Sequence, residues 1–257
     1  MIDPASFPGR GKVAVLRTAP ESVLEDIGQL MRMVDYQAAL PRDAKTILKV
    51  NISWQQWYPA CSTAPWQLEG VISTLLQDAY SDVIAAHNRT VVVDAHVGEV
   101  NNKHKLVTDR HGIPSVHLYE PEVEWVSYEP RQPFLVLDRI FPDGVKIPRM
   151  FIGSNIIQLP TVKTHVFTTI TGAMKNAFGG LLSERRHWTH AHIHETLVDL
   201  LTIQQDILRW RRSGAPRHAH PREGRYPGII GPGSHRRHLG KVAGLRPSVH
   251  PLHPHRT

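Results

Sequence analysis

The sequence contains a single cysteine, Cys61, among 257 residues. One thiol cannot form an intramolecular disulfide, a zinc site made of cysteines alone, or an iron–sulfur cluster held by this chain's own thiolates. Any divalent metal ion that the chain binds must therefore be held by histidine or carboxylate ligands. With 17 histidines in the chain, a divalent metal cofactor is compatible with the composition.

The sequence also lacks long apolar runs. No stretch of about 18 apolar residues could span a bilayer, and the N-terminus does not show the basic-then-apolar order of a secretory signal. Hydrophobic residues still make up 41% of the chain, which is enough to fill the core of an enzyme-sized domain. We expect a cytoplasmic globular protein that does not associate with a membrane, and nothing in the sequence specifies its oligomeric state.

Acidic residues are nearly missing from the C-terminal end. Residues 209–257 hold ten arginines and one lysine against Glu223 alone, so they carry +10, and the net charge of +7 leaves −3 for residues 1–208. A basic tail can attract phosphates without specificity. The rest of the chain shows neither a helix-turn-helix nor a stacked-aromatic pattern, so we expect no sequence-specific nucleic-acid binding.

The same basic tail, residues 209–257, is rich in residues that do not build a core. It contains seven prolines, seven glycines and seven histidines without apolar periodicity, which predicts an irregular, disordered segment. A GC-rich gene translated out of frame gives the same composition, so a frame-shifted end is an alternative interpretation. We therefore divide the chain into a domain at 1–208 and a tail at 209–257.

Strand and helix patterns alternate through the first hundred residues. Extended, β-branched runs predict strands at 12–17, 46–50 and 90–94. Apolar residues at three- and four-residue spacing predict helices at about 18–34 and 65–79, each with a proline in its first turn. A succession of strand, helix and strand favours parallel pairing with right-handed crossovers. The predicted fold class is α/β, with a layered, mostly parallel sheet, helices on both faces and the irregular basic tail behind it.

The second half is less regular. Short strands are predicted at 115–119, 124–127 and 134–137, followed by a clearer strand at 155–159 that Pro160 ends. Two helices then follow, one from about 171 to 182 and one over 193–208, whose inward residues are predicted to be Leu197, Leu200, Leu201 and Ile207.

The strongest local signal lies between residues 159 and 180. It reads Leu159-Pro-Thr-Val-Lys163-Thr-His165 and then Thr171-Gly-Ala-Met-Lys175-Asn176-Ala-Phe-Gly179-Gly180. Ligand sites of open α/β sheets lie beyond the carboxyl ends of strands, and the N–H groups of Thr171 and Gly172 at the following helix start would favour an anion. The alternative is that the lysines are solvated surface charges and His165 is an ordinary turn residue.

Other polar residues come at the ends of the predicted strands and could reach the same place. Lys49 and Asn51 stand at the end of the second strand, and Asp94 stands at the end of the third. We therefore predict a composite site for a small anionic molecule, with His165 and Lys175 at its chemical centre. Its predicted binding residues are Lys49, Asn51, Thr63, Asp94, Lys163, Thr171, Gly172 and Asn176.

A second cluster consists of His187, His190, His192 and His194, with Glu195 beside it. On a helix His187, His190 and His194 would share one face and could bind a divalent metal ion. Because the cluster stands just before an apolar helix, a polar helix entrance is an equally good interpretation.

The phrases Leu-Pro-x-x-Lys-x-His and Thr-Gly-Ala-x-Lys-Asn-x-Phe-Gly resemble the signature of the uncharacterised family called domain of unknown function 362. Lys49-Val-Asn51, Ser62-Thr-Ala-Pro65 and Val91-Val-Val-Asp94 agree with other parts of that pattern, and the resemblance covers about residues 45–206. Many members carry a ferredoxin-like cluster module, which the single cysteine excludes here. The Gly-rich C-terminal portion that is usual in the family is also not recognisable after Leu208.

The segment is more distantly similar to the lactate racemase family. In that family a histidine is followed ten residues later by the lysine that carries a nickel-pincer cofactor, and His165 and Lys175 have this spacing. The resemblance implies that Lys175 is a cofactor anchor and His165 a metal ligand or general base, in a racemase- or isomerase-like enzyme.

Three functional hypotheses follow. The first is a protein of the named family that binds a small anion at the strand ends. One form of this hypothesis is an enzyme that acts on a carboxylate. The second is a non-catalytic metal- or redox-associated module that uses His187, His190 and His194. The third is a truncated, inactive gene product.

Overall fold

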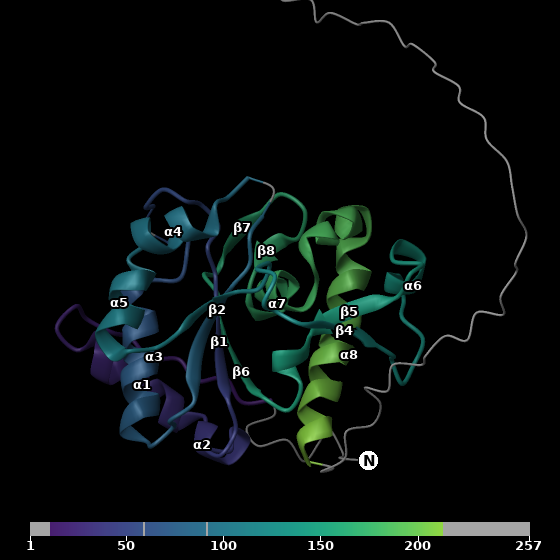
Figure 1. Cartoon of the computed structure of the whole chain (residues 1–257). Helices are drawn as coiled ribbons and strands as arrows, with labels where there is room; N and C mark the ends of the chain where they lie inside the picture. The colour runs from purple at the N-terminus through teal and green to yellow at the C-terminus, as the bar shows by residue number, and fades with distance from the viewer. Residues whose placement is uncertain (1–10, 59, 91, 213–257) are drawn as a thin grey trace, which may run out of the picture. The chain divides into compact units, whose positions relative to one another are not determined.

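The computed structural model describes residues 11–58, 60–90 and 92–212 (Figure 1). The predicted tail lies outside these residues, except for the end of the last helix. Four strands form a wholly parallel sheet in the order β3-β2-β1-β6. They are β1 (Thr46–Val50), β2 (Val83–His87), β3 (Ser115–His117) and β6 (Asn155–Leu159). The predicted parallel α/β sheet is confirmed.

Helices cover both faces of this sheet because alternate strand residues face opposite ways. Leu48, Val50 and Ala85 pack into one apolar cluster with α1 (Val23–Met33), α3 (Pro65–Gln77) and α5 (His104–His111). Ile47 and Ala86 pack into a second cluster with α7 (Ala173–Leu181) and α8 (Ile193–Arg212). Figure 1 shows α1 and α3 on one side of the strands and α7 and α8 on the other.

Two small antiparallel sheets accompany the main one. β4 (Trp125–Tyr128) pairs with β5 (Val145–Pro148) and packs into the same cluster as α8, while β7 (Lys163–His165) pairs with β8 (Thr169–Thr171). The remaining elements are short: α2 (Tyr36–Ala39), α4 (Ala95–Asn101), α6 (Leu137–Ile140) and the 3₁₀ segments Arg149–Phe151 and Glu184–His192. Among the described residues, no helix has the length and apolar character needed to cross a membrane.

Three strand predictions are wrong. Residues 12–17 pair with no strand in the described part of the chain, and Val13 and Val15 are 88% and 79% exposed. The described residues of 90–94 connect β2 to α4, where the Asp94 side chain accepts a hydrogen bond from Val97 N–H at 3.0 Å. At 134–137 the Asp199 carboxylate accepts the N–H groups of Leu135, Val136 and Leu137 at 2.8–3.1 Å, so this segment turns into α6 instead of pairing as a strand.

Candidate functional site

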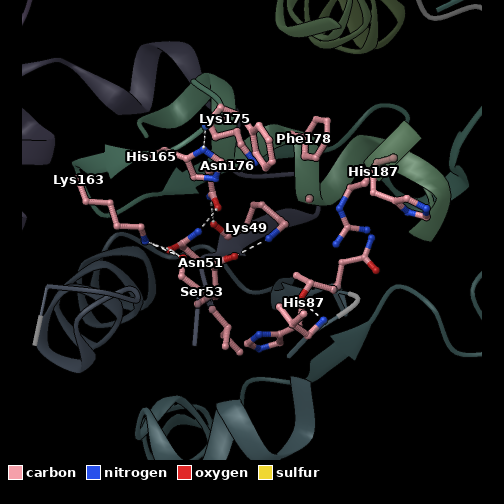
Figure 2. Close-up of a pocket in the computed structure, with 18 of the residues that line it drawn as sticks. Lys49, Asn51, Ser53, His87, Lys163, His165, Lys175, Asn176, Phe178 and His187 are labelled. Carbon is pink, nitrogen blue, oxygen red and sulfur yellow. Dashed lines mark hydrogen bonds between the residues drawn. The ribbon is translucent and has the colours of Figure 1, made fainter. Parts of the chain in front are cut away.

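A cavity of about 480 Å³ lies where β1 and β2 end and the β7–β8 hairpin and α7 follow (Figure 2). Six residues of the predicted anion site line it: Lys49, Asn51, Lys163, His165, Lys175 and Asn176. They come from β1 and the turn after it, from β7 and from the first turns of α7. The strand-end argument therefore placed these residues together, from segments more than 100 residues apart.

The cavity is strongly basic. Lys49, Lys163, Lys175 and Arg186 line it together with His87, His165, His187 and His190, and none of the described residues in its lining carries a carboxylate. Like charges gathered in a partly buried space repel one another and disfavour their charged forms. The described lining of the cavity thus has no negative charge to balance the positive charges of its lysines and its arginine.

Lys49 experiences this environment most strongly. It is the last residue but one of β1, is only 4% exposed, and donates a hydrogen bond to the carbonyl oxygen of Val50. Burial, with a smaller contribution from the charge of Arg186, lowers the pKa of Lys49 to about 7. Lys49 is therefore a poorly solvated amine that gains its proton only near neutrality.

Lys175 lies in the first turn of α7, with its Nζ 4.3 Å from the centre of the Phe178 ring. Burial, together with the charges of Arg186 and Lys163, lowers the pKa of Lys175 to about 8. The aromatic face offers the ammonium group a weak electrostatic partner, worth about 0.5–2 kcal/mol. An anion in the cavity would be a far stronger one.

Lys163 is held differently. Its Nζ donates to Asn51 Oδ1 at 2.9 Å, to Ser53 Oγ at 2.6 Å and to the carbonyl oxygen of Cys61. An ammonium group has three donors, so these contacts use them all. We therefore assign Lys163 a long-range electrostatic role and a structural one, joining β7 to the segment after β1.

His165 ends β7, and its Nδ1 accepts a hydrogen bond from the Phe167 N–H at 3.1 Å. Accepting at Nδ1 leaves the other ring nitrogen, Nε2, to carry the proton of the neutral ring. Burial, followed by the charges of Lys175 and Lys163, lowers the pKa of His165 below its ordinary value. The ring is thus a neutral donor at the cavity wall.

Asn176 connects the elements around the cavity through three side-chain hydrogen bonds. Its Nδ2 donates to the Lys49 carbonyl oxygen at 2.7 Å and to Gln158 Oε1 at 3.0 Å, and its Oδ1 accepts from Asn51 Nδ2 at 3.4 Å. These bonds tie α7 to β1 and β6. Figure 2 shows Asn51, Asn176 and Lys49 converging in this way.

Four other predicted binding residues do not line the cavity. The buried Thr63 hydroxyl donates to the Leu159 carbonyl oxygen at 2.5 Å and accepts the Asn51 N–H at 2.8 Å, so it joins two strand ends. Asp94 caps α4 and lines a second cavity. Thr171 is buried at the end of β8, and Gly172 is the N-cap of α7. The hydrogen bonds of Thr63 and Asp94 give these two residues a structural role, whereas Thr171 and Gly172 lie outside the described cavity lining.

The predicted histidine trio is not gathered at one point. His187 and His190 line the cavity, whereas His194 lies exposed in the first turn of α8. The ring of His190 stacks on Phe167 and Phe178, with centroids 4.5 and 5.8 Å away. The chain changes here from a 3₁₀ segment, with three residues per turn, to an α-helix, so the spacing assumed for one continuous α-helix does not apply.

Two titratable residues of the described cavity lining were missed by sequence reasoning. His87 ends β2 and is 1% exposed, and burial lowers its pKa well below the ordinary value. It was missed because the strand was predicted at 90–94. Arg186 is also buried, with its guanidinium group donating to the carbonyl oxygens of Ser183 and Arg89. No sequence signal distinguished it from Arg185, which is exposed.

Comparison with known proteins identifies one family. The model of the family described as Domain of unknown function (DUF362) matches residues 46–211, which is more than half of the chain. No curated protein and no solved structure matches the sequence, so the resemblance to lactate racemases is not confirmed. The family match covers all four strands of the main sheet and every described residue that lines the basic cavity. The chain therefore belongs to the domain of unknown function 362 family.

Proposed function

We propose that the basic cavity binds a small anionic molecule, with a carboxylate or phosphate group directed at Lys49, Lys175 and Arg186. The observation that carries the proposal is the set of four basic side chains around one space whose described lining holds no carboxylate. Its volume of about 480 Å³ falls within the usual range of small-molecule sites. A bound anion would restore the solvation that burial removes from these cations.

The same site has groups that can move a proton. Lys175, with its pKa of about 8, is present in both protonation states near neutral pH, and His165 is a neutral imidazole beside it. General acid–base catalysis works best when the pKa of the group lies near the working pH. We propose that the site catalyses proton transfer at the carbon next to a bound carboxylate, with Lys175 and His165 as the exchanging groups.

The test is calorimetric titration of the full chain with inorganic phosphate and with malonate, one probe for each anion chemistry. Lys175→Met should weaken binding of the probe that fits by at least about tenfold, because a lost charge-assisted hydrogen bond costs about 1.5–3 kcal/mol. His165→Ala should weaken it less. The matched control is Lys146→Met, which removes the same charge from an exposed position of β5 outside the cavity lining.

Lys49→Met is a second cavity variant, and circular dichroism should show that it and the three variants above remain folded. If Lys175→Met and Lys49→Met bind both probes as tightly as the unchanged protein, the cavity is not an anion site. A loss of equal size in Lys146→Met would instead attribute binding to general surface charge.

A further inference from the structure

A second group of titratable residues lies beside the cavity, at the carboxyl ends of β2 and β3. His87 and His117 end these neighbouring strands and are register partners, with ring centroids 5.4 Å apart. Helix α4 follows β2 and contributes His96 and Glu99, which are three residues apart and therefore share one helix face. The ring of His96 lies 3.9 Å from that of His117, centroid to centroid.

Glu99 is the centre of this group. Its side chain is 5% exposed, with Oε2 lying 3.0 Å from His117 Nε2 and Oε1 lying 3.7 Å from His87 Nε2. Ser115 also donates its hydroxyl to the carboxylate. Among the described residues neither a lysine nor an arginine forms an ion pair with Glu99, although a buried carboxylate needs a compensating positive charge.

Ring nitrogens around Glu99 are also left without hydrogen bonds. Within the described part of the chain, neither ring nitrogen of His87 has a hydrogen-bond partner, and His87 is 1% exposed. Nε2 of His117 is close to Glu99 but is not aligned for a hydrogen bond. Buried polar atoms are normally satisfied, and each exception costs about 1–3 kcal/mol. This arrangement indicates a site that another ligand completes.

We propose that His96, Glu99 and His117 bind a divalent transition-metal ion such as Zn²⁺. One ligand atom from each of these residues lies within 4.8 Å of the others, and no other set of three His, Cys, Asp or Glu residues among those described meets this criterion. Two imidazoles and one carboxylate are a ligand set found in catalytic zinc sites, where a fourth position stays open. The positive ion would also compensate the buried charge of Glu99.

Residues around the three ligands fit this assignment. Nε2 of His96 lies 3.2 Å from Glu120 Oε1, which fixes the ring and leaves its other nitrogen for the ion. Ligand histidines usually carry such a carboxylate partner. His96 is half-exposed and lines a second cavity of about 450 Å³ together with Tyr119 and Glu120, so the open position would face solvent or a ligand.

The metal proposal does not depend on the anion proposal. The two cavities are distinct spaces, although Thr90 and Val92 line both of them. None of the three metal ligands lines the basic cavity. A negative result at one site therefore leaves the other unaffected.

The test is a titration of the full chain with Co²⁺ after treatment with a chelator, monitored by visible absorption and by the number of ions bound. The chain has 17 histidines, and any of them can bind Co²⁺ weakly. The readout is therefore the difference in bound Co²⁺ between the unchanged protein and its variants. Glu99→Gln and His96→Ala should each remove one bound Co²⁺ ion, together with the visible absorption band that Co²⁺ shows at a low coordination number. If the ion still binds, its affinity should be weaker by at least about 100-fold. Glu120→Gln should weaken it by about 10- to 100-fold.

His192→Ala is the matched control, because it removes an exposed histidine outside the group and should leave the band unchanged. If Glu99→Gln fails to fold, His96→Ala carries the test, since the His96 side chain is 59% exposed. The proposal is overturned if the unchanged protein binds no more Co²⁺ than His96→Ala. It is also overturned if the band persists in that variant.

Discussion

At the scale of single residues, the most unusual group is the buried ammonium of Lys49. The pKa of Lys49 is about 7 in the folded chain, against an ordinary value of 10.5. Between these two pH values the unfolded chain binds more protons at this residue than the folded chain does. Protonation therefore favours unfolding, and the free energy of unfolding should rise as the pH increases from about 7 towards 10.5.

Replacing Lys49 tests this linkage directly. Lys49→Met keeps the length of the side chain without its charge, so it should stabilise the fold by at least about 1 kcal/mol below pH 7, where the cost of protonating Lys49 is fully present. The gain should shrink as the pH rises and vanish above 10.5. Urea unfolding at several pH values measures both curves, and a gain that does not vary with pH would show that packing, not charge, is responsible.

Lys175 makes a separate prediction about binding. Because an anion needs the protonated amine, affinity for sulfate, whose charge is constant over this range, should fall as the pH rises through about 8, the pKa of Lys175. A bound anion favours the ammonium form, so the midpoint measured with ligand should lie above that value. Calorimetry across pH provides the measurement. The fall should be much shallower in Lys175→Met, and an unchanged profile there would assign the titration to another group.

Residue identity together with strand position placed six of the ten predicted anion-site residues at the cavity. Lys49, Asn51, Lys163, His165, Lys175 and Asn176 all line the cavity, because polar residues that follow buried parallel strands share one edge of the sheet. Thr63 also lies near this edge of the sheet. Its hydroxyl, however, forms hydrogen bonds with the Asn51 N–H and the Leu159 carbonyl oxygen, at the ends of β1 and β6. Whether a polar group faces a cavity or a neighbouring backbone depends on tertiary packing, which one sequence does not reveal.

At the scale of elements, strand β2 shows where pattern reasoning fails. Its sequence, Val83–His87, is buried throughout and has two alanines at its centre, so it lacks the bulky β-branched character expected of a strand. The valine-rich run after it fits that expectation better, yet Val92 is 71% exposed and the run leads into α4. Alanine is used in β2 because helices pack closely on both faces, a cause visible only in the folded chain.

Close packing between α1 and α3 leads to an element-scale prediction. A Cβ atom at Gly70 would lie 2.9 Å from Ile27 Cβ, so Gly70 allows the two helices to approach each other. Alanine normally stabilises a helix interior by about 1 kcal/mol relative to glycine. At Gly70 the clash should outweigh that gain, and Gly70→Ala should destabilise the domain by about 1–3 kcal/mol.

Gly179→Ala in α7 is the matched control for this prediction. Its new Cβ would meet only the end of the Lys49 side chain, at 3.8 Å, which is an ordinary contact. This variant should be neutral or slightly stabilised in thermal unfolding. Equal effects of the two substitutions would show that helix propensity, not the approach of α1 to α3, determines the outcome.

At the scale of the whole molecule, charge is distributed very unevenly. Residues 1–208 sum to −3, yet the cavity within them is lined by cations, while residues 209–257 carry +10. The charges of the proposed small-anion site and those of residues 209–257 are therefore separated along the chain. A small ligand is selected by a shaped, buried site, whereas a polyanion responds to the number of exposed charges.

This separation predicts what removal of residues 213–257 should do. The cut removes seven arginines and one lysine, so non-specific binding to heparin or DNA should weaken and its dependence on salt should become shallower, since fewer counterions are released. Phosphate or malonate binding in the cavity should be unchanged, because every described residue of its lining precedes the cut. Salt-gradient heparin chromatography and calorimetry on the same pair of proteins measure the two effects. If shortening the chain weakened cavity binding as much as heparin binding, the lysines of the cavity and the arginines of the tail would be acting as one electrostatic surface, and the site would not select small anions by its shape.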